Sequence, residues 1–322
     1  MKYTIGIDIG GTNTIFGLVD ENGTIVHQTG IKTRDSQTIN NYLDALTYNI
    51  QRLIEKIETP ENIIAVGVGA PNGNAFRGTI EYAPNLPFEG VIELKKELEQ
   101  RLLSLGYDLK VYVTNDANAA AIGEMMYGKA KDGVRNFIMI TLGTGVGSGI
   151  VADGKLIYGH TGFAGEIGHT KVSSGGRKCK CGKNACAETY ASASGIVKTV
   201  WNRLKKQWHP SILAGIPFEE LDVKLIADAA LKGDKAALFA FELAARKLAV
   251  ALANAVAVTS PEKIYLFGGI AASGDLLLKP LRAFLEKELY VSFKNSVSVE
   301  LSGLQQADAA ILGAAALGLT GN

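Results

Sequence analysis

Hydrophobic and polar residues follow two different rhythms along this chain. The β-branched run Tyr3–Ile9 and the continuous apolar run Ile63–Gly69 are typical of strands, the second of a strand buried on both faces. Between them, apolar residues from Ile39 to Ile57 recur in steps of four and three, which predicts an amphipathic helix with Ser36 as its N-cap. Strands that alternate with helices in this way predict an α/β fold.

Further elements follow from the same patterns. We expect strands at 14–19, 24–28 and 111–114, a helix at 91–105, and a long loop at 69–87 that is rich in proline and asparagine. In the second half we expect strands at 136–142, 148–151, 263–267 and 297–301, and helices at 195–206, 223–231, 235–258 and 307–319.

The second half begins as the first half does. The strand at 136–142 runs into Gly143-Thr144-Gly145 and a further strand, just as the first strand runs into Gly10-Gly11 and the strand after it. Such an internal repeat suggests two domains of one architecture. We therefore expect a smaller α/β domain at residues 1–115 and a larger one at residues 116–302.

Composition and charge exclude several classes of protein. The chain has 322 residues, of which 47% are hydrophobic and 20% charged, as in globular proteins. A net charge of +1 gives no basic excess to attract nucleic acid or an anionic membrane. The longest apolar runs, at 248–258 and 309–319, are too short to span a bilayer, and Asp8 interrupts the first strand, so no signal peptide is expected. We expect a cytoplasmic protein.

Glycine turns directly after strands indicate a site for phosphate groups. Three such turns occur, at Gly10-Gly11, Gly143–Gly147 and Gly268-Gly269, and glycine lets backbone amides approach phosphate oxygens. None of them fits the P-loop, which needs a lysine after its last glycine. The turns therefore favour a nucleoside triphosphate, with Asp8 as a carboxylate that holds Mg²⁺ directly or through water. The alternatives are ordinary hairpin glycines and an aspartate that bonds its own turn.

All three cysteines lie close together, at Cys179, Cys181 and Cys186, and His169 precedes them. Three thiolates and an imidazole form a tetrahedral set that suits zinc and leaves no open position for water, which predicts a structural site. An odd number of cysteines also argues against a disulfide framework and for a reducing compartment. The alternative is three free thiols and an unrelated histidine.

Asp116 lies where the strand at 111–114 runs into a helix. An aspartate at a helix start is usually an N-cap, and that role alone explains the residue. The C-terminal end of a strand at a domain junction is, however, where α/β proteins bind ligands, and a carboxylate there can accept the proton of an attacking hydroxyl.

Several short motifs resemble, in their order along almost the whole chain, those of the ROK family (repressor, open reading frame, kinase). They are Asp8-x-Gly-Gly-Thr-Asn, Pro84-Asn85-Leu86, Asn115-Asp116-x-Asn118, Gly143-Thr144-Gly145, Gly165-Glu166-x-Gly168-His169, the cysteine cluster and Glu188. The resemblance implies an actin-like ATPase (ribonuclease H-like) fold, with two α/β domains around a cleft. It also implies that the C-terminal helix, at about 303–322, packs on the N-terminal domain.

The resemblance also implies the role of each site residue. Asp116 would be the catalytic base. Zinc would be bound by His169, Cys179, Cys181 and Cys186. If His169 binds zinc with one ring nitrogen, we expect it to offer the other to the sugar. The sugar hydroxyls would be held by Asn85, Asn115, Glu166, His169 and Glu188. ATP and Mg²⁺ would be held by Asp8, Gly10, Gly11, Thr12, Asn13, Gly143, Thr144, Gly145, Gly268 and Gly269.

The activity that the resemblance implies is ATP-dependent transfer of phosphate to the 6-hydroxyl of a hexose, as in a glucokinase, by a homodimer. Alternatives are an N-acetylhexosamine or fructose kinase of the same family, or a noncatalytic sugar-responsive regulator. Regulators of the family carry a DNA-binding segment ahead of the first strand, whereas seven residues precede Asp8 here. One residue departs from the family pattern: Asn72 stands where glycine usually follows Gly-x-Pro, which puts the sugar preference in question.

Overall fold

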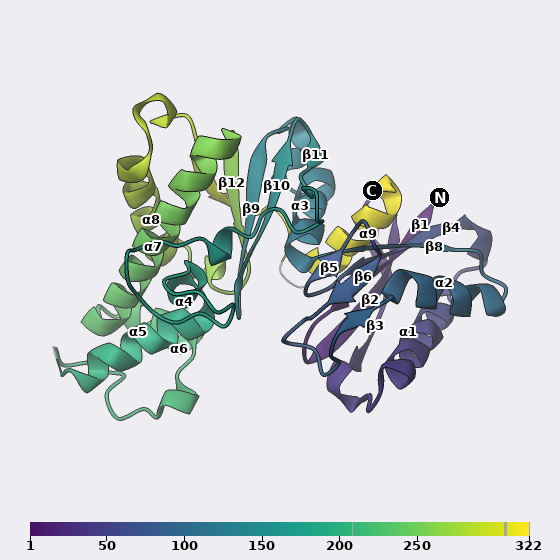
Figure 1. The fold of residues 1–322 in the computed structure, drawn as a ribbon, viewed down its shortest axis with the longest axis horizontal. Helices are drawn as coiled ribbons and strands as arrows, with labels where there is room; N and C mark the ends of the chain where they lie inside the picture. The colour runs from purple at the N-terminus through teal and green to yellow at the C-terminus, as the bar shows by residue number, and fades with distance from the viewer. Residues whose placement is uncertain (208, 306–307, 322) are drawn as a thin grey trace. The chain divides into compact units, whose positions relative to one another are not determined.

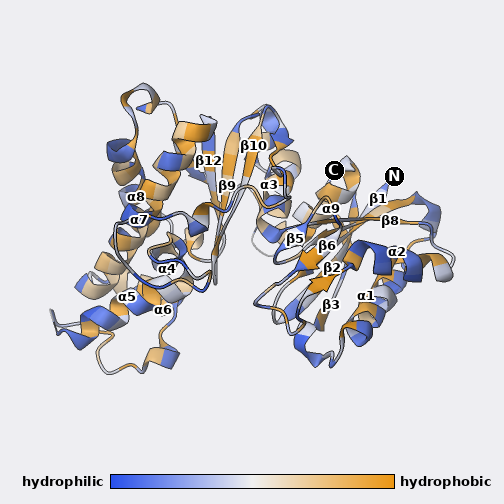
Figure 2. Ribbon diagram, in the orientation of Figure 1, coloured by the Kyte–Doolittle hydropathy of each residue, from blue (hydrophilic) through white to orange (hydrophobic). Residues whose placement is uncertain are grey.

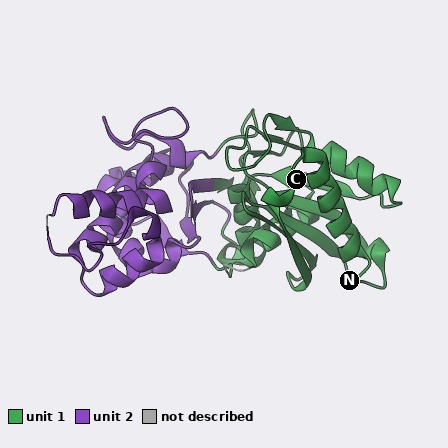
Figure 3. Cartoon of the chain, turned by 90° about the horizontal axis from the view of Figure 1, so that it is seen from below, with its two compact units in different colours: residues 1–134, 149–164, 303–322 green, residues 135–148, 165–302 purple. Residues whose placement is uncertain are grey.

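The computed structural model describes residues 1–207, 209–305 and 308–321. They form two compact units (Figure 3). Unit 1 contains residues 1–134, 149–164 and 303–322, and unit 2 contains residues 135–148 and 165–302. The expected domain boundary at residue 115 left residues 116–134 and 149–164 in the C-terminal domain, whereas the structure places both segments in unit 1. The predicted start of the last helix, residue 307, lies outside the described residues.

Unit 1 is built on a five-stranded sheet with the order β3-β2-β1-β4-β8. Its strands are β1 (Tyr3–Ile9), β2 (Asn13–Asp20), β3 (Ile25–Lys32), β4 (Ile63–Gly69) and β8 (Lys110–Thr114). β1, β4 and β8 run parallel, with Asp8 opposite Gly69 and Gly69 opposite Thr114. The C-terminal ends of these three strands therefore lie in one row, the usual place for a ligand in an α/β sheet.

Helices α1 (Ile39–Ile54) and α2 (Leu94–Ser104) cover one face of this sheet (Figure 1). Their apolar side chains share one buried cluster with Ile5, Ile7 and Ile9 of β1. The N-cap of α1 is Thr38, whose hydroxyl accepts the Asn41 amide at 3.2 Å, and not Ser36 as predicted. Residues 36–38 precede the helix because Thr38 is the residue that reaches the first free amides.

The predicted loop at 69–87 and the predicted start of the α2 helix at 91 were wrong in part. Three short strands, β5 (Gly73–Asn74), β6 (Thr79–Glu81) and β7 (Val91–Ile92), form a small sheet there. Strands of two or three residues are too short to show a period in the sequence. The small sheet holds the segment that carries Asn85.

The opposite face of the unit 1 sheet receives α9 (Ala309–Thr320) in a row of glycines. Gly6 of β1 pairs with Gly17 of β2 and with Gly67 of β4. A methyl group at Gly67 would lie 1.8 Å from the Ala314 carbonyl oxygen, and one at Gly6 would lie 2.2 Å from that of Ile311. The helix thus packs directly on the backbone of three strands, and any side chain in the row would displace it.

The second sheet has the order β11-β10-β9-β12-β13. Its strands are β9 (Phe137–Leu142), β10 (Val146–Ala152), β11 (Lys155–Leu156), β12 (Lys263–Phe267) and β13 (Ser298–Leu301). Both sheets thus share one order, in which the first strand lies centrally, as the internal repeat predicted. The hydropathy colouring in Figure 2 shows apolar residues along β9, β10 and β12.

The remaining helices are α3 (Asp116–Tyr127), which belongs to unit 1, and a group in unit 2. That group consists of α4 (Glu188–Ala191), α5 (Ala193–Lys205), α6 (Val223–Leu231), α7 (Lys235–Thr259) and α8 (Asp275–Glu288). α7 contacts each of the other four. No helix in the described part of the chain has both the length and the apolar character needed to cross a membrane.

Candidate functional site

Two carboxylates meet at the C-terminal ends of the unit 1 strands. Asp8 is the penultimate residue of β1, and Asp116 follows β8 as the first residue of α3. Gly69, the last residue of β4, separates them, and a methyl group at that glycine would lie 3.8 Å from the Asp116 Cα. The strand register therefore brings together two acidic residues that are far apart in the sequence.

Asp116 is exposed, and Asn115 is the N-cap of α3. The Asn115 side-chain oxygen accepts the Asn118 amide at 2.6 Å, so the interpretation of Asp116 as an N-cap is wrong. The Asp116 carboxylate accepts the neighbouring Ala117 amide at 2.8 Å. The Asp116 side chain is in contact with solvent, but the surrounding protein displaces much of its water, and this desolvation raises the pKa of Asp116. Asp116 is thus an accessible carboxylate with increased basicity.

Asp8 has a pKa of about 7, well above the ordinary value. Burial is the larger cause, and repulsion by the nearby Asp116 carboxylate adds to it. A divalent cation beside Asp8 would reverse both effects, because it favours the ionised form. A half-buried carboxylate of this kind therefore fits the predicted Mg²⁺ site.

The loop between β1 and β2 contains Gly10, Gly11, Thr12 and then Asn13. It closes on itself through the Gly10 amide, which donates to the Asn13 carbonyl at 2.9 Å. Within the described residues, no hydrogen bond is recorded for the amides of Gly11 and Thr12. Adjacent backbone amides without partners form an anion-binding concavity. Gly11 has a second reason to be glycine, because a methyl group there would lie 2.5 Å from the Asn85 carbonyl oxygen.

Asn72, which departs from the family pattern, occupies a left-handed backbone conformation with φ of 52°. Asparagine is one of the few residues that adopt it readily, so it can stand in for glycine. Its side-chain amide donates to the carbonyls of Glu81 and Tyr82 at 3.0 and 3.2 Å. Asn72 therefore supports the small sheet that leads to Asn85.

The glycines of unit 2 fall into two kinds. Gly143 and Gly269 have no atom within 4 Å of the place where a methyl group would project, so the space beside them is open to a ligand. At Gly145, an added methyl group would lie 2.7 Å from the Glu188 carboxylate. At Gly268, it would lie 2.4 Å from the Leu142 carbonyl oxygen, and the backbone φ is 103°. β9 and β12 pair in parallel, which puts both turns at one edge of the sheet.

The predicted metal ligands converge in unit 2. The donor atoms of His169, Cys179, Cys181 and Cys186 all lie within 4.8 Å of one another. The Cys181 and Cys186 sulfurs are 3.6 Å apart, as are the Cys179 sulfur and His169 Nδ1. A zinc tetrahedron with ordinary bond lengths has edges of about 3.8 Å between two sulfurs and about 3.6 Å between sulfur and nitrogen. These two separations match such a tetrahedron, so the four side chains are a suitable ligand set for zinc.

Two segments that carry proposed sugar ligands of unit 2 contact Val146, the first residue of β10. Glu188 Oε2 accepts the Val146 amide at 3.0 Å, and Glu188 Oε1 lies 3.9 Å from the Cys179 sulfur. Gly168 lies against the Val146 carbonyl, so the turn that carries Glu166 and His169 packs on the same residue. Val146 therefore connects the glycine turn before it to Glu188 and to the turn that carries His169.

Arg177 is a structural residue of this region that the sequence analysis missed. Its guanidinium donates to the carbonyls of Thr189 and Gly195 and to the Thr199 hydroxyl, each at 2.8 Å, and stacks on the Tyr190 ring. These bonds fasten the cysteine-bearing segment to α4 and α5 independently of any metal. An arginine in a segment rich in lysine gives no signal in the sequence that could distinguish it.

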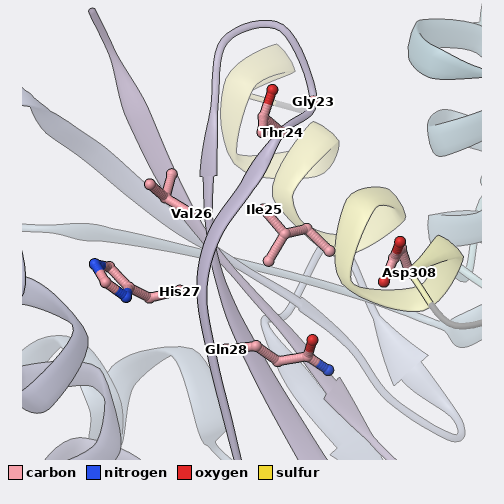
Figure 4. A pocket seen from close by; sticks show the side chains of 7 residues that line it. All are labelled: Gly23, Thr24, Ile25, Val26, His27, Gln28 and Asp308. Carbon is pink, nitrogen blue, oxygen red and sulfur yellow. The ribbon is translucent and has the colours of Figure 1, made fainter.

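A cavity of about 580 Å³ in unit 1 does not coincide with the predicted site. Figure 4 shows its lining residues along the edge strand β3 and its preceding turn, with Asp308 at the start of α9. They are Gly23, Thr24, Ile25, Val26, His27, Gln28 and Asp308. None of them has a predicted role, so the functional assignment depends on side-chain chemistry and not on this cavity.

Comparisons with known proteins agree with the motifs and the geometry. A glucokinase from Thermotoga maritima is 35% identical over 317 residues, which cover 97% of this chain and 96% of that protein. A xylose repressor from Caldicellulosiruptor bescii is 28% identical over 315 residues, 97% of this chain and 77% of the repressor.

The structure is similar to that of a ROK family glucokinase from Streptomyces griseus in complex with glucose and AMPPNP. The TM-score is 0.80 at 34% identity, and 98% of each chain is covered. The predicted actin-like ATPase fold is confirmed by this likeness. The family model for the ROK family matches residues 4–320. The chain therefore belongs to the ROK family.

Proposed function

We propose that the protein is an ATP-dependent hexose kinase that phosphorylates the 6-hydroxyl of glucose. The relatives named glucokinase support this activity, as does the similar structure that was determined with glucose and AMPPNP. Within the chain, the observation that carries the proposal is Asp116. Its carboxylate is accessible, has a raised pKa, and follows the C-terminal end of a parallel strand next to Asp8.

Asp116 would act as the general base. A raised pKa brings a carboxylate closer to the working pH, which increases its ability to accept the proton of the sugar hydroxyl. The proton moves to Asp116 as the hydroxyl oxygen forms its bond to the γ-phosphorus and the bond to the leaving ADP breaks. Phosphoryl transfer depends mainly on positioning and charge stabilisation, so one well-placed base is sufficient protein chemistry.

The glycine turns would hold the ATP phosphates. The amides of Gly11 and Thr12 in unit 1, and the open turns at Gly143 and Gly269 in unit 2, leave room for phosphate oxygens. Asp8 would hold Mg²⁺, which supplies neutralisation of the phosphate charge when it is bound. Thr144, Gly145 and Asn13 would complete the loops as backbone positions.

The sugar would be bound by acidic and amide side chains that the cysteine cluster helps to place. His169 Nδ1 faces Cys179, which leaves Nε2 for a sugar hydroxyl. Glu166 and Glu188 flank the cluster, and Asn85 and Asn115 belong to unit 1. A bound Zn²⁺ would supply structural order and not catalysis, because four protein ligands leave no open position.

The proposal can be tested by assaying glucose, fructose and N-acetylhexosamines as substrates of the wild-type protein and of Asp116→Asn. We expect the wild-type protein to phosphorylate glucose with ATP in a coupled spectrophotometric assay, and the variant to lose roughly 10²–10⁴-fold in kcat. Asp222→Asn, which makes the same change at the N-cap of α6, is the control and should retain activity.

Two results would contradict the proposal. Phosphorylation of fructose or an N-acetylhexosamine in place of glucose would retain the kinase and correct the substrate. Binding of sugar without any phosphorylation would favour the regulator, the class to which the xylose repressor relatives belong.

A further inference from the structure

A chain of buried hydroxyl groups runs from helix α1 to the phosphate-side loop of unit 1. The Tyr42 hydroxyl lies 2.6 Å from the Thr14 hydroxyl, and the Thr14 hydroxyl lies 2.9 Å from that of Thr33. The Thr33 hydroxyl donates to the Gly10 carbonyl at 2.8 Å. All three side chains are at most 1% exposed. None of these residues was singled out by the sequence motifs.

The direction of every bond in the chain follows from the proton count. A hydroxyl has one proton to donate, and a carbonyl can only accept. Because Thr33 gives its proton to Gly10, it must accept from Thr14, and Thr14 in turn must accept from Tyr42. Burial raises the pKa of Tyr42 to about 12, so its phenol remains protonated. The series of hydrogen bonds from Tyr42 thus ends at the Gly10 carbonyl, and the donor of each bond is assigned.

The residues after β3 also hold the next two carbonyls of the loop. The Thr33 amide donates to the Thr12 carbonyl at 3.0 Å, and Arg34 Nε donates to the Gly11 carbonyl at 3.2 Å. In a trans peptide the carbonyl and the following amide point in opposite directions, and the structure contains no cis peptide bond among its described residues. Holding the carbonyls of Gly10 and Gly11 therefore turns the amides of Gly11 and Thr12 away from Thr33.

We propose that Thr33, with Thr14 and Tyr42 behind it, is a positioning residue that aims the Gly11 and Thr12 amides at a phosphate group of the nucleotide. The inference rests on the proposed function in one respect, namely that this loop binds ATP. Thr33 itself need not touch the nucleotide, because its side chain is buried and bonded to the loop carbonyl. Its effect should fall on nucleotide binding and leave sugar binding unchanged.

Thr33→Val removes the hydroxyl and retains the shape and the backbone amide. We expect it to raise the KM for ATP about tenfold, the cost of one buried hydrogen bond that orients a binding group, with the KM for glucose within about twofold of wild type. Thr33→Ser should restore most of the ATP affinity. Tyr42→Phe should have a smaller effect in the same direction, because it removes only the outermost donor.

Thr47→Val is the matched control. Thr47 lies on the same helix as Tyr42 and is also buried, but its hydroxyl donates to the Leu43 carbonyl within the helix. It should lower stability about as much as Tyr42→Phe and leave the KM for ATP unchanged. Equal ATP affinity in Thr33→Val and Thr47→Val would overturn the positioning role.

Calorimetry with AMPPNP and Mg²⁺ separates this inference from the proposed function. If the wild-type protein binds the analogue but phosphorylates no sugar, the kinase proposal fails, and weaker binding by Thr33→Val still supports the role of Thr33. If the wild-type protein binds no nucleotide, the inference is wrong. Amide exchange at residues 10–13 in the ligand-free protein should also be faster in Thr33→Val than in Thr47→Val.

Discussion

Asp8 ties the stability of unit 1 to pH. Its pKa of about 7 in the folded protein lies above the value of 3.8 expected in the unfolded chain. Between these two values the folded state binds more protons, so the free energy of unfolding falls as pH rises through this window and is level above it. Asp8 should therefore destabilise the ligand-free protein at pH 8 by roughly 1–3 kcal/mol, after allowance for its partial exposure.

Asp8→Asn should remove this cost. We expect the variant to be more stable than wild type at pH 8 in urea unfolding without Mg²⁺ or ATP, with the difference shrinking toward pH 4. Asp308→Asn, which makes the same change at another partly buried carboxylate of unit 1, serves as the comparison. A stability difference for Asp8→Asn that does not change with pH would contradict the assignment of the titration to Asp8.

Individual glycines show how far residue-level prediction from the sequence can reach. The pattern of glycine after a strand located Gly11, Gly143, Gly145 and Gly269, but it could not distinguish their purposes. Gly143 and Gly269 face open space, whereas Gly11 admits the Asn85 backbone and Gly145 admits the Glu188 carboxylate. Those neighbours come from distant parts of the sequence, so only the folded structure reveals which glycine leaves room for a ligand.

At the scale of elements, the packing of α9 on the glycine row of the unit 1 sheet leaves no room for an added methyl group. Gly67→Ala would place a methyl group 1.8 Å from the Ala314 carbonyl, so the helix or the strand must move. We expect a loss of at least about 2 kcal/mol in the free energy of unfolding, measured in urea. Gly30→Ala, on the edge strand of the same sheet with its nearest neighbour at 3.3 Å, should cost less than about 1 kcal/mol.

Equal stabilities of the two alanine variants would show that α9 does not depend on close contact with the strands.

Elements such as β1, β4, α6 and β12 were predicted with their observed bounds, because each is a complete apolar pattern between clear turns. The short strands β5–β7 were missed, since tertiary pairing and not local pattern creates them.

At the scale of the whole molecule, the repeat of one strand order in two sheets was foreseen from a few matched residues. The division into units was foreseen only in part. The C-terminal segment 303–322 belongs to unit 1, as the family resemblance implied, whereas residues 116–134 and 149–164 join unit 1 through contacts that sequence order does not show. The convergence of the four candidate metal ligands was predicted from the sequence, since cysteine and histidine side chains have few other reasons to cluster. The hydroxyl chain behind Gly10 was not, because threonine and tyrosine are common in any core.

The cysteine cluster lies within unit 2, so loss of the zinc that we propose it holds should have a local effect. The segment 173–183 is rich in glycine, serine and lysine, so it has little apolar surface of its own to order it. Zinc would order this segment and the flanking residues, which include Glu166 and Glu188, while Arg177 fastens it to α4 and α5 without metal. Removing one ligand should accordingly disorder the sugar side chains and leave the packing of unit 1 intact.

Cys181→Ser tests this separation, because Cys181 is the exposed ligand and the change is small. We expect loss of bound zinc by metal analysis and a 10–100-fold weaker affinity for glucose by calorimetry. Hydrogen exchange should become faster in residues 166–188 and remain unchanged in residues 1–134. Lys180→Ala, an exposed change in the same segment that removes no metal ligand, should keep the metal and the glucose affinity. A zinc-free Cys181→Ser protein that binds glucose as tightly as the control would show that the cluster does not serve the sugar site.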